Sequence, residues 1–245
     1  MARGQQFQTV DGQPLLSIDL RQVGPNKFQL TAPFKYLDPT RANQAHVVPA
    51  HNLMDPKDNS DLASVPFVLW WFIASYGHQT APALLHDHLL KPDPPSSERR
   101  EFDRIFREAL RDAGVRLFRR WIMWAGVSVQ TIRTISVVAF VLLVVQLVAG
   151  WAALWGFTWG DAFGVPWWAW VFLPAVIAVL WTWYFRAVLI GTYVGAFLLP
   201  ATIFVVLTVG AASVARTLQW LVGGASLSDG EGPIVAPYRV PGWDD

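Results

Sequence analysis

The stretch TAPALLHDHLLKPDPPSSERREFDRIFREALRDAG, residues 80–114, contains two helix patterns. Each pattern includes polar residues that can come together when the helices pack. Thr80 is a capping residue followed by Pro82 in a first helical turn, and the proline-rich KPDPPSS segment ends this helix. Ser97 opens a second helix with a single apolar stripe that runs until Gly114. The stripe consists of Phe102, Ile105, Phe106, Ala109, Leu110 and Ala113. Two helices with so short a connection are predicted to pack antiparallel.

Three polar residues of this pair are candidates for one site. His86 and Asp87 lie about 100° apart around the first helix, so both can border one cleft, whereas His88 points about 200° away from His86. Asp103 lies about 80° from the centre of the apolar stripe on the second helix. The pair can therefore bring His86, Asp87 and Asp103 together. Ion pairing of Asp103 at the surface is the alternative, because four arginines surround it: Arg99, Arg100, Arg104 and Arg107.

The residues before this pair predict short antiparallel strands and loops over 13–50. PLLSIDL alternates Leu16, Ile18 and Leu20 with polar neighbours, GPNK (24–27) is a turn, and FQLTAPFKYL continues the strand pattern. A turn-rich loop follows, and then an aromatic run (65–77) that predicts a helix. The sequence thus predicts an α+β domain over residues 1–128.

The second half of the chain has a different composition. The chain is 53% hydrophobic with 14 tryptophans, yet from Thr134 to Ala215 the only charged residues are Asp161 and Arg186. Uncharged runs of about 20 residues are long enough to cross a bilayer core of roughly 30 Å. We expect a membrane module over 129–216, followed by a Gly/Pro-rich tail (217–245). Its three expected spans are 134–155, 166–185 and 188–215. A buried helical hairpin in a soluble protein is the alternative.

Charge and composition narrow the expected partners and location. A net charge of +1 leaves no basic stripe for nucleic acid, and the absence of cysteine removes disulfides, thiolate zinc ligands and cysteine nucleophiles. The opening MARGQQFQTVDGQ has no apolar core typical of a signal peptide. Arginines flank the first span, and the loop 156–165 lacks them. We expect a multi-pass protein of the bacterial inner membrane with a cytoplasmic N-terminal domain.

The order of motifs resembles a bacterial and phage family known as domain of unknown function 1353. The resemblance spans about residues 28–128 and rests on DLASVP (61–66), the tryptophan pair 70–71, Gly77, HDHL (86–89) and DRIF (103–106). Ser60 stands where the family usually has threonine, and the loop from Pro49 to Asp61 is longer than expected. The family has no assigned activity, so the resemblance implies kinship of fold.

A more distant resemblance suggests chemistry. In the secreted phospholipase A2 family, a His-Asp pair on one helix faces an aspartate on the next. That resemblance implies His86 as general base, Asp103 as the residue that orients it, and Asp87 as a metal ligand with Asp61 nearby. The implied cofactor is a divalent metal (calcium, magnesium or zinc) in a lipid or peptide hydrolase. This chain lacks that family's cysteines, and a cytoplasmic site would meet little calcium.

A non-enzymatic role is the competing hypothesis. A small folded domain with apolar spans is also typical of a membrane scaffold, pore or assembly component. Arg186 and Asp161 are the only ionisable residues that could mark an ion path, and both lie near span ends, which disfavours a selective channel. Partners would then be the lipid bilayer together with further copies of the chain or other membrane subunits.

Overall fold

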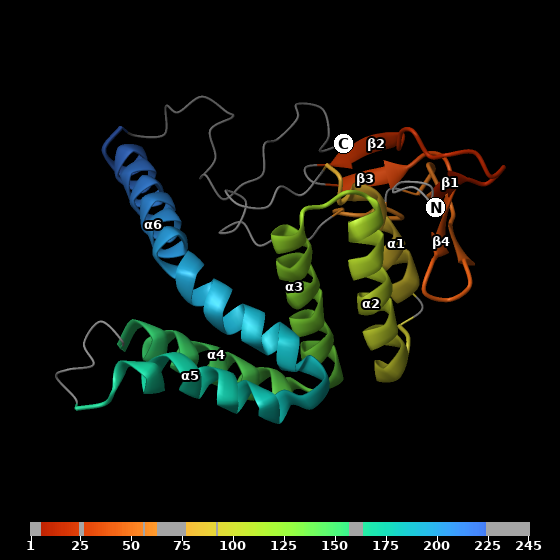
Figure 1. Cartoon of the computed structure of the whole chain (residues 1–245). Helices are drawn as coiled ribbons and strands as arrows, with labels where there is room; N and C mark the ends of the chain where they lie inside the picture. The colour runs from red at the N-terminus through yellow and green to blue at the C-terminus, as the bar shows by residue number, and fades with distance from the viewer. Residues whose placement is uncertain are drawn as a thin grey trace.

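The computed structural model describes residues 6–24, 27–55, 57–62, 77–91, 93–156 and 164–223. A small α+β region holds five strands and the helices α1–α3, and an apolar region holds α4–α6 (Figure 1). This confirms the predicted fold class of short antiparallel strands followed by helices. The expected aromatic helix at 65–77 lies almost wholly outside the described residues.

The strands form two small antiparallel sheets. A three-stranded sheet has the order β1 (Phe7–Thr9), β4 (Phe34–Asp38), β5 (Gln44–Val48). A separate hairpin pairs β2 (Leu20–Gly24) with β3 (Lys27–Leu30). In the central strand β4, alternate residues are fully buried, as expected for a strand with one face on a core.

The strand prediction was wrong at the N-terminal end. β1 lies before residue 13, and the expected strand over PLLSIDL begins only at Leu20. The segment touches β1 only locally, through the hydrogen bond from Leu15 N–H to the Phe7 carbonyl and a bridge between Gln8 and Pro14. Leu16 is 94% exposed, whereas its neighbours Leu15 and Ile18 pack against the core.

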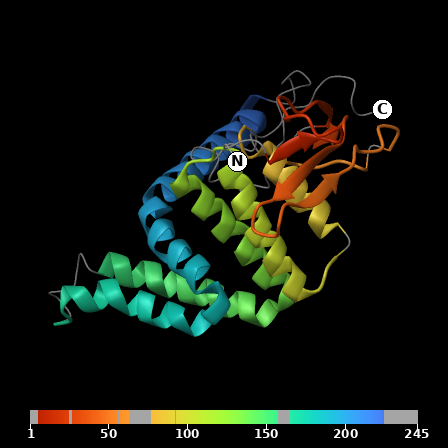
Figure 2. The same cartoon turned by 45° about the vertical axis from the view of Figure 1, so that its right-hand side comes forward.

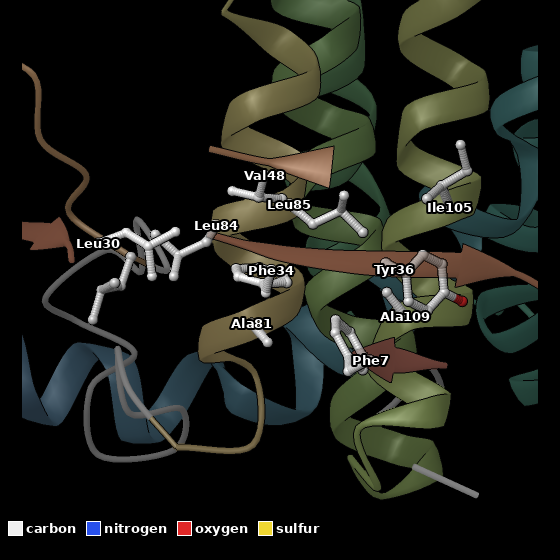
Figure 3. Close-up of a cluster of buried hydrophobic side chains, with 11 residues drawn as sticks. Phe7, Leu30, Phe34, Tyr36, Val48, Ala81, Leu84, Leu85, Ile105 and Ala109 are labelled. Carbon is white, nitrogen blue, oxygen red and sulfur yellow. The ribbon is translucent and has the colours of Figure 1, made fainter. Parts of the chain in front are cut away.

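Helices α1 (Thr80–Leu90) and α2 (Ser96–Asp112) cover the sheet and share its core. Figure 3 shows the sheet's side chains meeting those of the two helices. Thr80 is the first helical residue rather than the cap, and its hydroxyl accepts a hydrogen bond from Gly77 N–H at 3.0 Å. The core consists of Phe7, Leu30, Phe34, Tyr36, Val48, Leu62, Ala81, Leu84, Leu85, Ile105 and Ala109.

Helix α3 (Leu117–Ile135) connects the two regions. Its composition is typical of a helix on a membrane surface, yet one face is buried and the helix contacts both α2 and α6. Figures 1 and 2 show it beside α2, with the α4–α5 hairpin projecting from its lower end. Arg107 of α2 stacks over the Trp121 ring at 4.9 Å from the centroid. The buried residues of α3 are Met123, Ala125, Ser128, Thr131 and Ile132.

Among the described residues, two helical stretches are long and apolar enough to cross a membrane, rather than the three expected. One is α4 (Val137–Gly156), and the other runs from Trp167 to Ala215. The second stretch contains α5 (Trp167–Ala178), the 3-10 helix η3 (Val179–Tyr184) and most of α6 (Phe185–Gly223). Helix α5 runs alongside α4, and the chain then turns at Thr182, where φ is +44°, before α6 begins (Figure 1).

These apolar helices are largely uncovered by the described chain. Only 11% of the residues in the most apolar window of each stretch are buried. Large side chains such as Leu180, Trp183 and Phe197 are each at least 78% exposed. In the buried core hairpin of a soluble protein, these apolar side chains would be covered by other parts of the chain. Here the described residues leave them exposed, so another apolar environment must cover them.

Helices α4 and α6 approach closely through glycines. A Cβ atom on Gly150 would lie 2.7 Å from Thr192 Cγ2, and one on Gly195 would lie 2.7 Å from the Trp151 indole. The indole is held in place, because its Nε1 donates a hydrogen bond to the Gly191 carbonyl at 3.1 Å. Small residues at the contact are what allow apolar helices to pack without a hydrophobic driving force between them.

Gly195→Ala is therefore expected to destabilise the α4–α6 contact by about 1–3 kcal/mol, the usual cost of overpacking. The measurement is the thermal unfolding midpoint of purified protein in detergent. Gly210→Ala is the matched control on the same helix, because no described atom outside that helix turn lies within 4 Å of the place that its added methyl group would take. Equal midpoints for the two variants would contradict the close packing.

Candidate functional site

His86 and Asp103 form a buried pair between α1 and α2. His86 Nε2 lies 2.9 Å from Asp103 Oδ1, and the two residues are only 8% and 2% exposed. The Phe106 ring packs against the imidazole, with centroids 4.9 Å apart. The antiparallel helices thus bring together two of the residues that the sequence singled out.

Thr131 of α3 completes this pair. Its hydroxyl donates a hydrogen bond to Asp103 Oδ2 at 2.8 Å, so both carboxylate oxygens are engaged by described residues. Asp103 is therefore not a surface ion-pairing residue, and that alternative is wrong. The nearby Arg104 instead pairs with Asp38 at 2.7 Å and with Glu101. Asp103 links α1, α2 and α3 through one side chain.

The geometry fixes the tautomer of His86. An ionised carboxylate only accepts hydrogen bonds, so Nε2 carries the proton that it donates to Asp103. The neutral imidazole then has its lone pair on Nδ1. Among the described residues, Nδ1 has no hydrogen-bond partner. A histidine held in this way is equipped to accept a proton from water or from a hydroxyl group.

Asp87 lies beside the pair but makes a different contact. Its Oδ2 accepts a hydrogen bond from the Ser60 hydroxyl at 2.5 Å, and Ser60 Oγ in turn accepts one from Leu62 N–H. Burial raises the pKa of the Asp87 carboxyl to about 6, and the negative charge of Asp61 adds to the rise. The hydrogen bond from Ser60 acts in the opposite direction.

The structure places Asp61 close enough to Asp87 to affect its charge, and Asp61 itself is half-buried. Within the described part of the chain, no three histidine, cysteine, aspartate or glutamate side chains gather in a group that could hold a metal ion. The metal role of Asp87 and Asp61 stays a prediction.

The other histidines have structural contacts. His46 lies in β5, and His51 Nδ1 accepts a hydrogen bond from Leu30 N–H at 2.6 Å. Burial holds the pKa of both imidazoles below its ordinary value. His78 Nδ1 lies 3.1 Å from the Ala113 carbonyl at the end of α2.

Sequence reasoning missed Ser60 and Thr131. Thr131 shares one face of α3 with the buried Ser128 and Ile132, so a polar residue on the covered face of a helix was the available signal. For Ser60, the motif resemblance offered a signal: the position usually carries threonine in the family and serine in this chain, and both residues have a hydroxyl group. A hydroxyl is what the Asp87 carboxylate requires there.

Residues 28–127 match the model of a family described as a protein of unknown function (DUF1353). This match supports the family resemblance for the region that contains α1, α2 and the first part of α3. It does not extend over α4–α6. Searches of curated proteins and of solved structures found no match. The roles of the site residues therefore depend on the geometry alone.

Thr131→Val should destabilise the protein by about 1–3 kcal/mol, because it leaves one oxygen of a buried carboxylate without its hydrogen bond while keeping the side-chain volume. Thermal unfolding in detergent measures this loss. Thr134→Val, one turn later on the same helix, is the control: Thr134 is exposed and bonds only the Gln130 carbonyl of its own helix. A Thr131 variant as stable as the control would contradict the network.

Asp87 should make stability depend on pH. Its folded-state pKa of about 6 lies above its ordinary value of 3.8, so the folded state binds the proton more tightly. The resulting stabilisation is complete below pH 3.8 and is lost as the pH rises through about 6. Asp87→Asn should therefore raise the unfolding free energy at pH 7.5 by at most about 3 kcal/mol, since each pKa unit corresponds to about 1.4 kcal/mol.

The measurement is the unfolding midpoint of both proteins between about pH 4 and 8, the range that brackets this titration. The asparagine keeps an oxygen that can accept the Ser60 hydrogen bond, so packing should be preserved. Parallel pH profiles for wild type and Asp87→Asn would refute the raised pKa.

Proposed function

We propose that this chain is a membrane-attached hydrolase in which His86 is the general base. The observation that carries the proposal is the buried chain of hydrogen bonds from Thr131 through Asp103 to His86 Nε2. It leaves Nδ1 as the basic atom and fixes the ring orientation. Such an arrangement is found where a histidine must accept and return a proton with defined geometry.

In the proposed reaction, His86 Nδ1 removes a proton from a water molecule as the water oxygen attacks an ester or amide carbonyl. The imidazolium that forms is stabilised by the Asp103 carboxylate 2.9 Å from Nε2. Nδ1 then returns the proton to the leaving group as the bond to the carbonyl carbon breaks. Asp103 is a positioning residue in this scheme, and Thr131 holds its carboxylate in place.

The proposal uses no metal step. Asp87 and Asp61 offer two carboxylates, whereas a calcium site takes about 6–8 oxygen ligands. The described residues add no further histidine or acidic ligand to form a group of three. Asp87 instead acts through its charge: burial raises its pKa to about 6, so above that pH it adds a second negative charge next to the His86–Asp103 pair.

Membrane attachment by α4–α6 is the second part of the proposal. It is supported by the exposure of apolar side chains along two stretches long enough to cross a bilayer. The proposal keeps the three crossings expected from the sequence, with α4, α5 and α6 as the first, second and third. We propose the bacterial inner membrane, with the N-terminal domain on the cytoplasmic side where Arg116, Arg119, Arg120 and Arg133 lie.

A membrane scaffold is the second candidate. The near-complete burial of His86, Asp103 and Thr131 favours it, because a hydrogen-bond network that joins three helices also serves to fix their packing. A scaffold needs this network for folding alone. The two candidates therefore differ in what a folded variant without His86 can do.

His86→Asn is expected to lower the hydrolysis of a fluorogenic phospholipid ester or a fluorogenic peptide amide by at least about 100-fold, the usual contribution of a general base. The assay uses full-length protein in lipid vesicles, and the unfolding midpoint of each variant is measured alongside. His88→Asn is the matched control, since it lies two residues away on α1 and outside the pair.

The hydrolase proposal is contradicted if the wild type hydrolyses neither probe above a protein-free blank. It is equally contradicted if folded His86→Asn keeps the rate of the His88→Asn control. A His86→Asn variant that only melts earlier, with the rate per folded molecule unchanged, would support the scaffold.

A further inference from the structure

A groove of about 420 Å³ lies between α3 and α6, away from the hydrogen bonds of the His86 pair. Its lining is apolar except for one cationic residue, Arg186, whose side chain is exposed. Pockets of this kind, apolar with a single fixed charge, bind ligands that have an apolar body and one charged group. The apolar lining consists of Phe118, Trp121, Ile122, Leu189, Ile190 and Val194.

The two helices that line this groove carry charge of one sign. Between Asp112 and Asp229 the chain has six arginines and one acidic residue, Asp161, which lies outside the described residues. Arg116 and Arg119 at the start of α3 are exposed on the same helix that lines the groove. Arg186 takes part in none of the ion pairs formed among the described residues. An anionic group at Arg186 would therefore meet mainly positive charge along this part of the chain.

The groove also borders the surface that we propose to lie in the membrane. Its α6 wall belongs to the apolar stretch Trp167–Ala215, and its α3 wall carries Trp121, a residue type enriched where apolar and aqueous phases meet. Basic pockets between helices on the cytoplasmic side of a membrane bind anionic lipid headgroups. A phospholipid is the ligand that has both the acyl chain and the anion.

We infer that the α3–α6 groove binds an anionic phospholipid, with an acyl chain against the apolar lining and the headgroup phosphate on Arg186. This inference rests on the membrane attachment within the proposed function and is independent of hydrolysis. The lipid joins α6 to α3, the helix whose Thr131 holds Asp103. Binding therefore stabilises the contact between the membrane helices and the helices of the His86 site.

The test compares thermal unfolding of delipidated full-length protein in detergent with added phosphatidylglycerol, phosphatidylcholine or inorganic phosphate. A ligand that binds only the folded state raises the unfolding midpoint in proportion to its affinity. Phosphatidylglycerol is expected to raise the midpoint clearly more than phosphatidylcholine, and phosphate alone should leave it unchanged.

Arg186→Gln should weaken the phosphatidylglycerol effect about fivefold in apparent affinity, the value of one basic residue at a lipid headgroup. Val194→Trp should abolish the effect by filling the groove while Arg186 remains. Arg133→Gln is the matched control: it also removes one positive charge but lies on α3 outside the groove lining, over the Phe140 ring. Its response should equal that of the wild type.

An equal response of Arg186→Gln and wild type, or an equal response to both lipids, would overturn the inference. A shift with inorganic phosphate alone would show a free-anion site and overturn it as well. Failure of the membrane attachment gives a different result, because the chain would then stay soluble without detergent. Failure of the hydrolase proposal leaves all of these midpoints unaffected.

Discussion

The hydrogen bonds of one buried carboxylate hold the centre of this molecule together. Asp103 accepts from His86 on α1 and from Thr131 on α3 while it is itself carried by α2, so three helices depend on a single charge. A buried charge is tolerated only when its hydrogen bonds are complete, and removing either donor leaves an uncompensated carboxylate. The three-helix arrangement and the orientation of the imidazole are therefore set by the same interaction.

This constraint extends to the apolar helices. Thr131 lies on the helix that leads directly into α4, and α6 packs against that same helix. Arg100 of α2 also stacks over Trp183 in η3, at 5.5 Å from the ring centroid. The helices that carry the His86 pair and those that expose apolar surface thus share contacts on two sides. A shift of α6 against α3 would therefore change the position of Thr131. This is the physical basis for linking the lipid groove to the His86 site.

The sequence predicted the parts of the fold that follow from local patterns. Residues 80–114 indicated both helices, because a capping signal, a proline-rich break and a regular apolar stripe all agreed. The meeting of His86 with Asp103 followed from helix geometry, but the donor on α3 did not, since nothing local relates Thr131 to a residue 28 positions earlier. PLLSIDL failed for a related reason: its alternation fits a strand, and only the tertiary context shows that Leu16 is exposed. The turn at Thr182 separates α5 from α6 within the stretch Trp167–Ala215, and no Gly or Pro stands at that position to predict it.

The oriented imidazole of His86 can perform chemistry only if its Nδ1 is reachable in the folded protein. Site-resolved mass spectrometry after brief treatment of the vesicle-embedded protein with an acylating reagent for neutral imidazole tests this directly. We predict that His86 is modified in the folded wild type at a rate comparable to or above that of His88, and more slowly in Asp103→Asn. A His86 that stays unmodified until the protein unfolds, while His88 reacts, would contradict the catalytic role and leave the network with a purely structural one.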